Sequence, residues 1–248
     1  MKGAGSMVSE LALFQVAAVA ALVGMALGWR GVMTRYAGFY DLPTAWNQIF
    51  WGIVIGGLFG SFSDRFLFSP YYTAIIEGKT NNLALSNLVV LVLGLSIGIH
   101  LMLRRDRVRK SGSQPTSGWA LGLAIGGMTS MYLMFRFMQL SEFSVFATMN
   151  IILLAIALPR TEALICCYHG YRMLHGERWK VVIRSFLWRT GLITTVYYAF
   201  FQPFAWVVLL PFLLIAERHS QDWVWAAVPK QARRRLRRIW ADKKREEE

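Results

Sequence analysis

The stretch LALSNLVVLVLGLSIGIHLML (83–103), followed directly by RRDRVRK (104–110), decides the fold. The first segment contains no Asp, Glu, Lys or Arg, and a helix of about 20 apolar residues can cross the hydrocarbon core of a bilayer. A helix suits that environment because it pairs its backbone N–H and C=O groups internally. Arginine-rich connectors are typical of the cytoplasmic side. The pair of segments therefore predicts a membrane-spanning helix that ends at a cytoplasmic loop.

The rest of the chain repeats this pattern. Hydrophobic residues make up 55% of the sequence and aromatic residues 14%, which exceeds ordinary globular usage. We expect an all-α, polytopic transmembrane helical bundle with spans at about 11–29, 45–62, 83–103, 119–140, 144–158, 181–200 and 203–216. The last two divide one apolar stretch at Gln202-Pro203, for which one span plus an interfacial helix is the alternative. Residues 1–216 then form the transmembrane domain and 217–248 a basic cytoplasmic tail.

The distribution of cations predicts the orientation. With 104–118 inside, the other inside segments are 30–44, 159–180 and 217–248. In chain order the four segments hold 2, 5, 4 and 10 Lys or Arg residues, against Lys2, Arg65 and Lys79 outside. We therefore expect an N-out, C-in protein, and the net charge of +13 needs no nucleic-acid partner.

Glycines recur at four-residue spacing in the first four predicted spans. Such spacing puts them on one face of a helix, where the missing side chains let two backbones approach closely. We therefore predict a tightly packed core, with chance spacing as the alternative. The residues are Gly24, Gly28, Gly52, Gly56, Gly60, Gly94, Gly98, Gly122 and Gly126.

Acidic residues all fall outside the predicted spans, which argues against proton relays and intramembrane aspartyl proteases. A G-x-S-x-G nucleophile motif is also absent from the sequence. Cys166 and Cys167 are adjacent and cannot build a framework of loop-closing disulfides. We expect no cofactor and no metal.

Arg189 is the deepest cation, about eight residues into the sixth predicted span. A charge at that depth should face the bundle interior, water or an anion. One interpretation is an anion or lipid-phosphate contact that Arg189 shares with Arg184 and Ser185. The alternative is that Arg189 and Arg184 extend towards the cytoplasm.

The segment TEALICCYHGYRMLHGERWK (161–180) is the richest polar cluster. If it is helical, Glu162, Cys166 and His169 share one face, and His175 follows. These residue types can bind a metal or activate a cysteine. The alternative is an interfacial helix that begins at Pro159 and carries no chemistry.

The tail predicts a helix that lies on an anionic leaflet. Leu236, Ile239 and Trp240 form an apolar strip, and each surrounding cation near such a surface contributes about 1 kcal/mol. RNA binding is the alternative. The cations are Lys230, Arg233, Arg234, Arg235, Arg237 and Arg238.

Three functions fit these observations. The leading hypothesis is a non-enzymatic subunit or scaffold of a membrane complex, in which a glycine-packed core of helices carries aromatic helices that dock lipids or partner subunits. The first alternative is a transporter or channel for a small solute or anion. The second alternative is a lipid-modifying enzyme that uses residues of 161–180.

Overall fold

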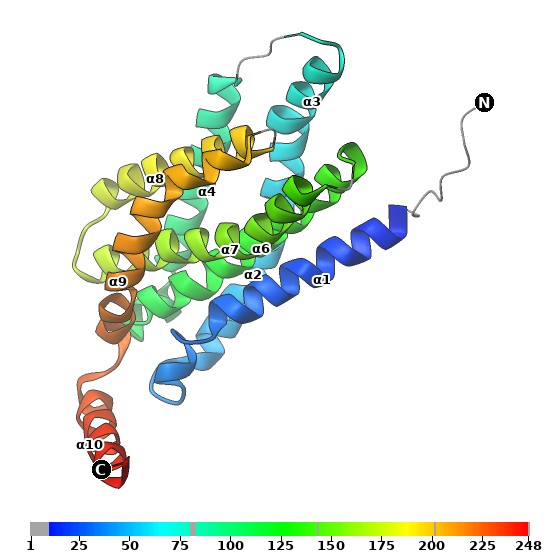
Figure 1. Ribbon diagram of the computed structural model, residues 1–248. Helices are drawn as coiled ribbons and strands as arrows, with labels where there is room; N and C mark the ends of the chain where they lie inside the picture. Colours follow the sequence, from blue (N-terminus) through cyan, green and yellow to red (C-terminus); the bar gives the residue numbers. More distant parts are fainter. Residues whose placement is uncertain (1–9, 80–82, 143, 201, 248) are drawn as a thin grey trace.

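The computed structural model describes residues 10–79, 83–142, 144–200 and 202–247, and this part of the chain is helical without strands (Figure 1). The all-α prediction is therefore confirmed. Lys2 lies outside the described residues. The elements are α1 (Glu10–Trp29), η1 (Thr34–Tyr36), α2 (Leu42–Ser63), η2 (Asp64–Phe68), α3 (Ser69–Ile76), α4 (Leu85–Leu103), α5 (Asp106–Lys110), α6 (Gln114–Leu140), α7 (Val145–Leu174), α8 (Trp179–Ala199), η3 (Pro203–Leu209), α9 (Leu210–Ala227) and α10 (Lys230–Glu247).

Four helices are long and apolar enough to cross a membrane: α1, α4, α6 and α7. Their presence fits a multi-pass membrane protein. The other long helices of the described chain do not combine sufficient length with sufficient apolar character. In α8, for example, Lys180, Arg184 and Arg189 interrupt the apolar sequence.

The long helices run between two ends of the bundle. At one end, the loop after α1 meets the tail, because Tyr36 packs on Trp240 with ring centroids 6.3 Å apart. The α4–α6 and α7–α8 connectors also meet there, where Arg104 and Arg178 line a common recess. We call this the basic end. The opposite end holds α3 and the α6–α7 and α8–η3 connectors.

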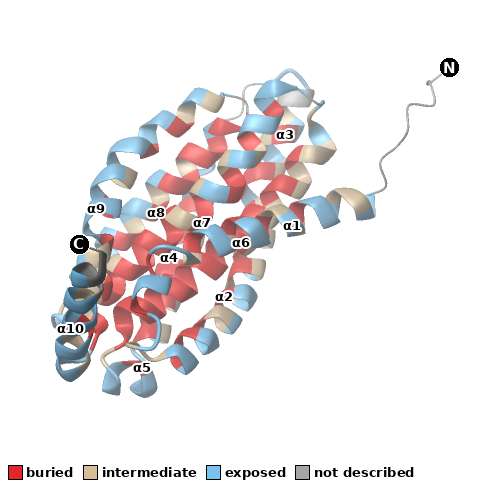
Figure 2. Ribbon diagram, turned by 60° about the horizontal axis from the view of Figure 1, so that its bottom comes forward, coloured by how far each residue is buried: buried red, intermediate tan, exposed pale blue. Residues whose placement is uncertain are grey.

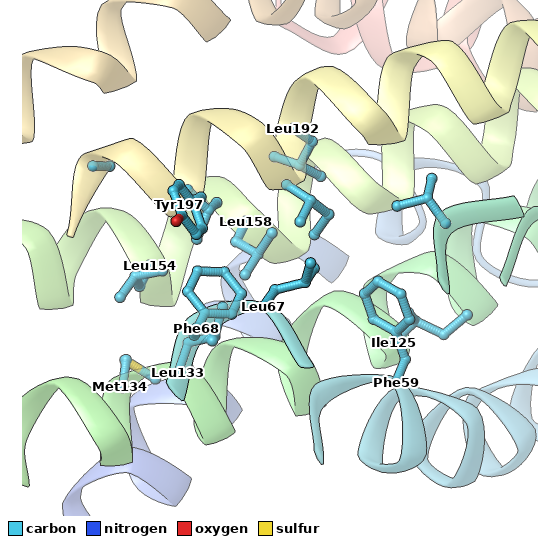
Figure 3. Close-up of a cluster of buried hydrophobic side chains, with 14 of the residues drawn as sticks. Phe59, Leu67, Phe68, Ile125, Leu133, Met134, Leu154, Leu158, Leu192 and Tyr197 are labelled. Carbon is cyan, nitrogen blue, oxygen red and sulfur yellow. The ribbon is translucent and has the colours of Figure 1, made fainter. Parts of the chain in front are cut away.

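Helix α6 forms the centre of the bundle, between α1, α2 and α7 (Figures 1 and 2). Buried residues follow it along most of its length. The main apolar cluster joins α6 to its neighbours; Phe59 of α2, Ile125 of α6, Leu158 of α7 and Leu192 of α8 belong to it (Figure 3). Because α6 is covered by other helices, its small and polar residues need not face lipid.

The outside of the bundle is apolar. Exposed large hydrophobic residues follow α1, α2 and α4, as Leu22, Phe50 and Val90 illustrate. In water such continuous apolar surface would favour association or aggregation. In a bilayer the same surface is in its preferred solvent.

Glycines of three helices, α1, α2 and α6, lie close to neighbouring helices. A Cβ at Gly24 would collide with the Ala155 carbonyl oxygen, and one at Gly56 would lie 2.7 Å from the Ile125 carbonyl oxygen. Gly122 and Gly126 of α6 face α7, as described below. Gly94 and Gly98 differ, because a Cβ at either would meet no heavy atom within 4 Å. The glycines of α4 therefore do not pack against the described helices.

Helix α7 continues through Pro159, where we expected a span to end and an interfacial helix to begin. Proline removes the N–H that would bond the carbonyl four residues earlier, which is Ala155. Gly24 packs directly on that carbonyl, and Ser130 Oγ donates to the neighbouring Leu154 carbonyl at 2.6 Å. Neighbouring helices thus accommodate the proline, as they do in membrane helices generally. Residues 161–174 consequently belong to the bundle.

The boundary of the tail also differs from the expectation. The second half of the 181–216 stretch is η3 followed by α9, and α9 runs on to Ala227. Residues 217–227, which we expected in the tail, therefore belong to a helix of the bundle. Ser220 and Val224 of this segment are buried. The separate amphipathic helix of the tail is α10.

Candidate functional site

A buried polar cluster joins α4, α7 and α8, and it is the candidate functional site. Each helix contributes side chains one or two turns apart, which lie on the same helical face. These pairs are Ser96 and His100 on α4, and Ser185 and Arg189 on α8. Helix α7 contributes Glu162, Cys166 and His169. The cluster consequently has two layers, one around Arg189 and one around His169.

Arg189 organises the first layer. Its Nε donates to Glu162 Oε1, its Nη1 donates to Ser96 Oγ at 3.1 Å, and its Nη2 donates to Cys166 Sγ at 2.9 Å. Arg189 is 1% exposed and Glu162 is 4% exposed. Burying either charge alone would cost several kcal/mol, so the two charges depend on each other.

His169 organises the second layer. Its Nδ1 lies 2.8 Å from Ser185 Oγ, and its Nε2 lies 3.1 Å from His100 Nδ1. Both nitrogens of His169 therefore have a partner. His100 stacks against Trp179 and lines the recess at the basic end. A continuous file of polar groups thus leads from that recess to Ser185, one helical turn from Arg189.

Helix α6 approaches α7 closely beside the cluster. A Cβ at Gly122 would lie 2.5 Å from the Glu162 carbonyl oxygen and 2.7 Å from Cys166 Cβ. Gly126 similarly faces Pro159, whose Cα would be 2.6 Å from an added Cβ. These two glycines bring the backbone of α7 close to α6, on the side of α7 that carries Glu162.

The first layer is closed to anything larger than a water molecule. The cavity lined by Glu162 and Arg189 has a volume of about 10 Å³, which is about the minimum for one water. Cys166 and His169 are both fully buried. Among the described residues, no group of three His, Cys, Asp or Glu side chains is placed to hold a metal ion. In this arrangement the cluster can connect helices and exchange protons along His100 and His169.

The structure brings together part of the predicted polar cluster. Glu162, Cys166 and His169 share one face, but that face is turned into the bundle, so Glu162 is an acidic residue inside it. This differs from the expectation, because the fifth predicted span ends at Leu158 and Glu162 follows it. His175 does not join them; it is exposed, and its Nδ1 lies 2.8 Å from the Tyr171 carbonyl oxygen.

The predicted anion contact is also arranged differently. Arg189 forms an ion pair with Glu162, and Ser185 forms a hydrogen bond with His169. Neither side chain is therefore directed at an external anion. Arg184 is exposed, and its Nη1 lies 3.3 Å from Tyr168 Oη and 3.4 Å from Glu177 Oε2. Ser96 and His100 complete the site. Their four-residue spacing on one predicted span was the signal in the sequence that could have identified them.

A second polar link lies towards the opposite end of the bundle. Asn150 Nδ2 donates to the Ala199 carbonyl at 2.9 Å, and its Oδ1 accepts from Trp206 Nε1 at 2.9 Å. One asparagine therefore joins α7, α8 and η3. At that end Arg136 Nε also donates to Asp64 Oδ2 at 2.9 Å, which ties α6 to η2.

The tail helix α10 is attached to the basic end. Arg233 donates to the Val228 carbonyl at 2.7 Å and to the Ala226 carbonyl at 2.9 Å. Trp240 stacks on Trp225, and Leu236 is buried. Arg234, Arg235, Arg237 and Arg238 remain exposed, as does Ile239 of the predicted apolar strip.

Comparison of the chain with models of protein families, with curated proteins and with solved structures gives no match. The geometry of the chain itself is therefore the basis for inferring its function.

Proposed function

We propose that the chain crosses a membrane seven times, with its N-terminus outside and its C-terminus in the cytoplasm. The crossing segments are α1, α2, α4, α6, α7, α8 and η3–α9, all of which run between the two ends of the bundle. Support comes from the apolar exterior and from the arginine-rich connectors gathered at one end. Trp29 and Trp46 pack together, with ring centroids 6.1 Å apart, and would mark the cytoplasmic boundary.

The function we propose is that of a non-enzymatic subunit or scaffold within a membrane complex. The observation that carries it is the closed polar cluster, in which Arg189, Glu162, Cys166 and Ser96 satisfy one another and leave no room for a substrate. Such a cluster fixes the positions of α4, α7 and α8. The apolar faces of α1, α2 and α4 remain available for lipids and partner subunits.

Membrane lipids are the second class of partner. The exposed arginines of α10 would lie against an anionic leaflet, and the attachment of Arg233 and Trp240 to the bundle holds that helix at the basic end. The attraction falls off within a Debye length of the surface, so the position of α10 matters for its strength.

Purification of the tagged chain from its own membrane in a mild detergent tests the scaffold proposal. We expect a defined protein to co-purify in a fixed ratio and to be lost when apolar residues on the outer face of α4, such as Val90 and Leu101, are changed to lysine. The matched control changes Arg234 to glutamine, away from that face. A chain that runs alone in every mild detergent would contradict the proposal.

Transport of a small solute, an anion or a proton is the second candidate. The polar file from the basic-end recess through His100 and His169 favours it. Flux into liposomes that contain the wild-type chain should then fall on His169→Gln, whereas the exposed control His175→Gln should leave it unchanged. Equal and negligible flux for all three proteins would argue against transport.

A further inference from the structure

The basic end contains a recess that the proposed scaffold function does not use. Its volume is about 340 Å³, within the range of about 300–1,000 Å³ that is usual for small-molecule sites. It lies where the α4–α5 and α7–α8 connectors meet the start of α6. The polar residues that line it are His100, Arg104, Arg109, Gln114, Glu177 and Arg178.

The charge of the recess is positive. Arg109 is paired with Asp106 at 2.8 Å, and Glu177 is bridged by both Arg172 and Arg184. Arg104 and Arg178 have no ion pair within the described part of the chain. Two guanidinium groups from different connectors therefore line one cavity without ion-pair partners of their own, because Glu177 is paired with other arginines.

Helix dipoles do not determine whether the recess prefers anions or cations. The N-termini of α6 and α8 border the recess and favour anions. The C-termini of α4 and α7 also border it and favour cations. These contributions offset each other, so the side chains set the sign of the potential.

Gln114 supplies an independent indication of a ligand. It is 6% exposed and lines the recess, yet its side-chain Oε1 has no hydrogen-bond partner among the described residues. A buried polar side chain almost always has a partner. Oε1 is an acceptor, and exchange of the amide oxygen and nitrogen positions would present the NH₂ group, a donor, to a phosphate oxygen.

We propose that this recess binds a phosphate group through Arg104 and Arg178, with Gln114 as the buried hydrogen-bond partner. Guanidinium groups match the geometry of phosphate oxygens, and their charge-assisted hydrogen bonds are among the strong ones. Leu103, Met173 and Leu174 add an apolar wall. Both a lipid headgroup and a water-soluble phosphate ester fit this chemistry. The inference does not depend on the scaffold role, because it rests on the recess alone.

Binding to the full-length chain in detergent tests the proposal with two probes, inorganic phosphate and phosphatidic acid added to the micelles. The readout is the rise in the thermal unfolding midpoint with probe concentration. The double variant Arg104→Gln/Arg178→Gln should weaken binding of the effective probe by about tenfold or more, equivalent to about 1.4 kcal/mol. Both arginines are exposed, so the variant should fold.

The matched control is Arg107→Gln/Arg218→Gln, which removes the same charge from exposed positions outside the recess. It should bind as the wild type does. A response to phosphatidic acid alone identifies a lipid site, and a response to inorganic phosphate identifies a site for soluble phosphate. If neither probe raises the midpoint, or if both double variants lose binding equally, the proposal is wrong. The scaffold proposal would survive that outcome.

Discussion

Arg189 of α8 and Glu162 of α7 form an ion pair inside the bundle, and both side chains are almost fully buried. A pair of this kind is costly to break, because the remaining partner is left as a buried, uncompensated charge. Substitutions of these two residues therefore test directly whether the ion pair holds α7 and α8 together.

Replacing one partner should be far more damaging than replacing both. We expect Arg189→Met to lower the free energy of unfolding by about 3–5 kcal/mol. Adding Glu162→Leu should recover most of this loss, because two apolar side chains then face each other. Denaturant titration in detergent micelles measures each variant. Additive losses in the double variant would show that the two residues do not interact.

Replacing glycines with alanine should have two different effects on stability, depending on how closely the glycine is packed. Gly24→Ala places a Cβ against the Ala155 carbonyl oxygen, so we expect a loss of about 1–3 kcal/mol. Gly94→Ala is the control because its Cβ would meet open space. Alanine favours helix over glycine, so Gly94→Ala should be neutral or stabilising by up to about 1 kcal/mol. Thermal unfolding of both variants checks this, and equal destabilisation would contradict the observed packing of α1 on α7.

Replacing Asn150 should lower the stability more than replacing an exposed polar residue of the same helix. Asn150→Leu leaves the indole N–H of Trp206 buried without an acceptor and should cost about 1–2 kcal/mol. Thr148→Val is the control, since Thr148 is exposed and donates only to the Ser144 carbonyl of its own helix. Thermal unfolding midpoints compare the two. A larger loss for Thr148→Val than for Asn150→Leu would not fit the structure.

Thiol labelling tests both burial and topology. The fully buried Cys166 and Cys167 should resist a maleimide in the folded protein and react only after unfolding. In a variant without these two cysteines, Ser111→Cys and Gln231→Cys should react from one side of sealed vesicles, and Lys79→Cys from the other. Labelling of Ser111→Cys and Gln231→Cys from opposite sides would contradict the proposed orientation.

Glu177 should make stability depend on acid pH. The hydrogen bond from Arg172 is the main cause that lowers the pKa of the Glu177 carboxyl below its ordinary value of 4.5. A lowered pKa means that the folded state favours the carboxylate, so Glu177 stabilises the fold above pH 4.5. This contribution disappears as the pH falls through the folded-state pKa.

The measurement for Glu177 is the unfolding midpoint of wild type and Glu177→Gln across this pH range. We expect the wild type to be more stable at neutral pH and the difference to vanish in acid. Glu142→Gln serves as the control, because Glu142 is exposed and has no ion pair in the described part of the chain. A difference that stays constant with pH would exclude the Arg172–Glu177 bridge as its source.

The sequence was sufficient to predict the helical class and the position of most long helices, because an apolar run of span length has few other solutions. It was misleading at Pro159, where local propensity favoured a helix end. The outcome there depended on Gly24 and Ser130, which lie far away in the sequence. Glu162 was consequently placed outside the bundle, and its pairing with Arg189 could not be seen.

The remaining site residues illustrate the same limit. The face shared by Glu162, Cys166 and His169 follows from helical periodicity alone, so the sequence reveals it. Which helix lies opposite that face depends on how α4 and α8 pack, and periodicity carries no information about that. The partners of His169 on α4 and α8 therefore emerged only from the structure.

The central position of α6 has a consequence for biogenesis. This helix carries Thr116, Ser117, Thr129 and Ser130, all buried among its neighbours, and a newly made α6 has no α7 to cover them. Ser130 donates to a carbonyl of α7, which leaves the ribosome later. Stable entry of α6 into the bilayer should therefore await synthesis of α7, so that the two segments insert as a hairpin rather than one after the other.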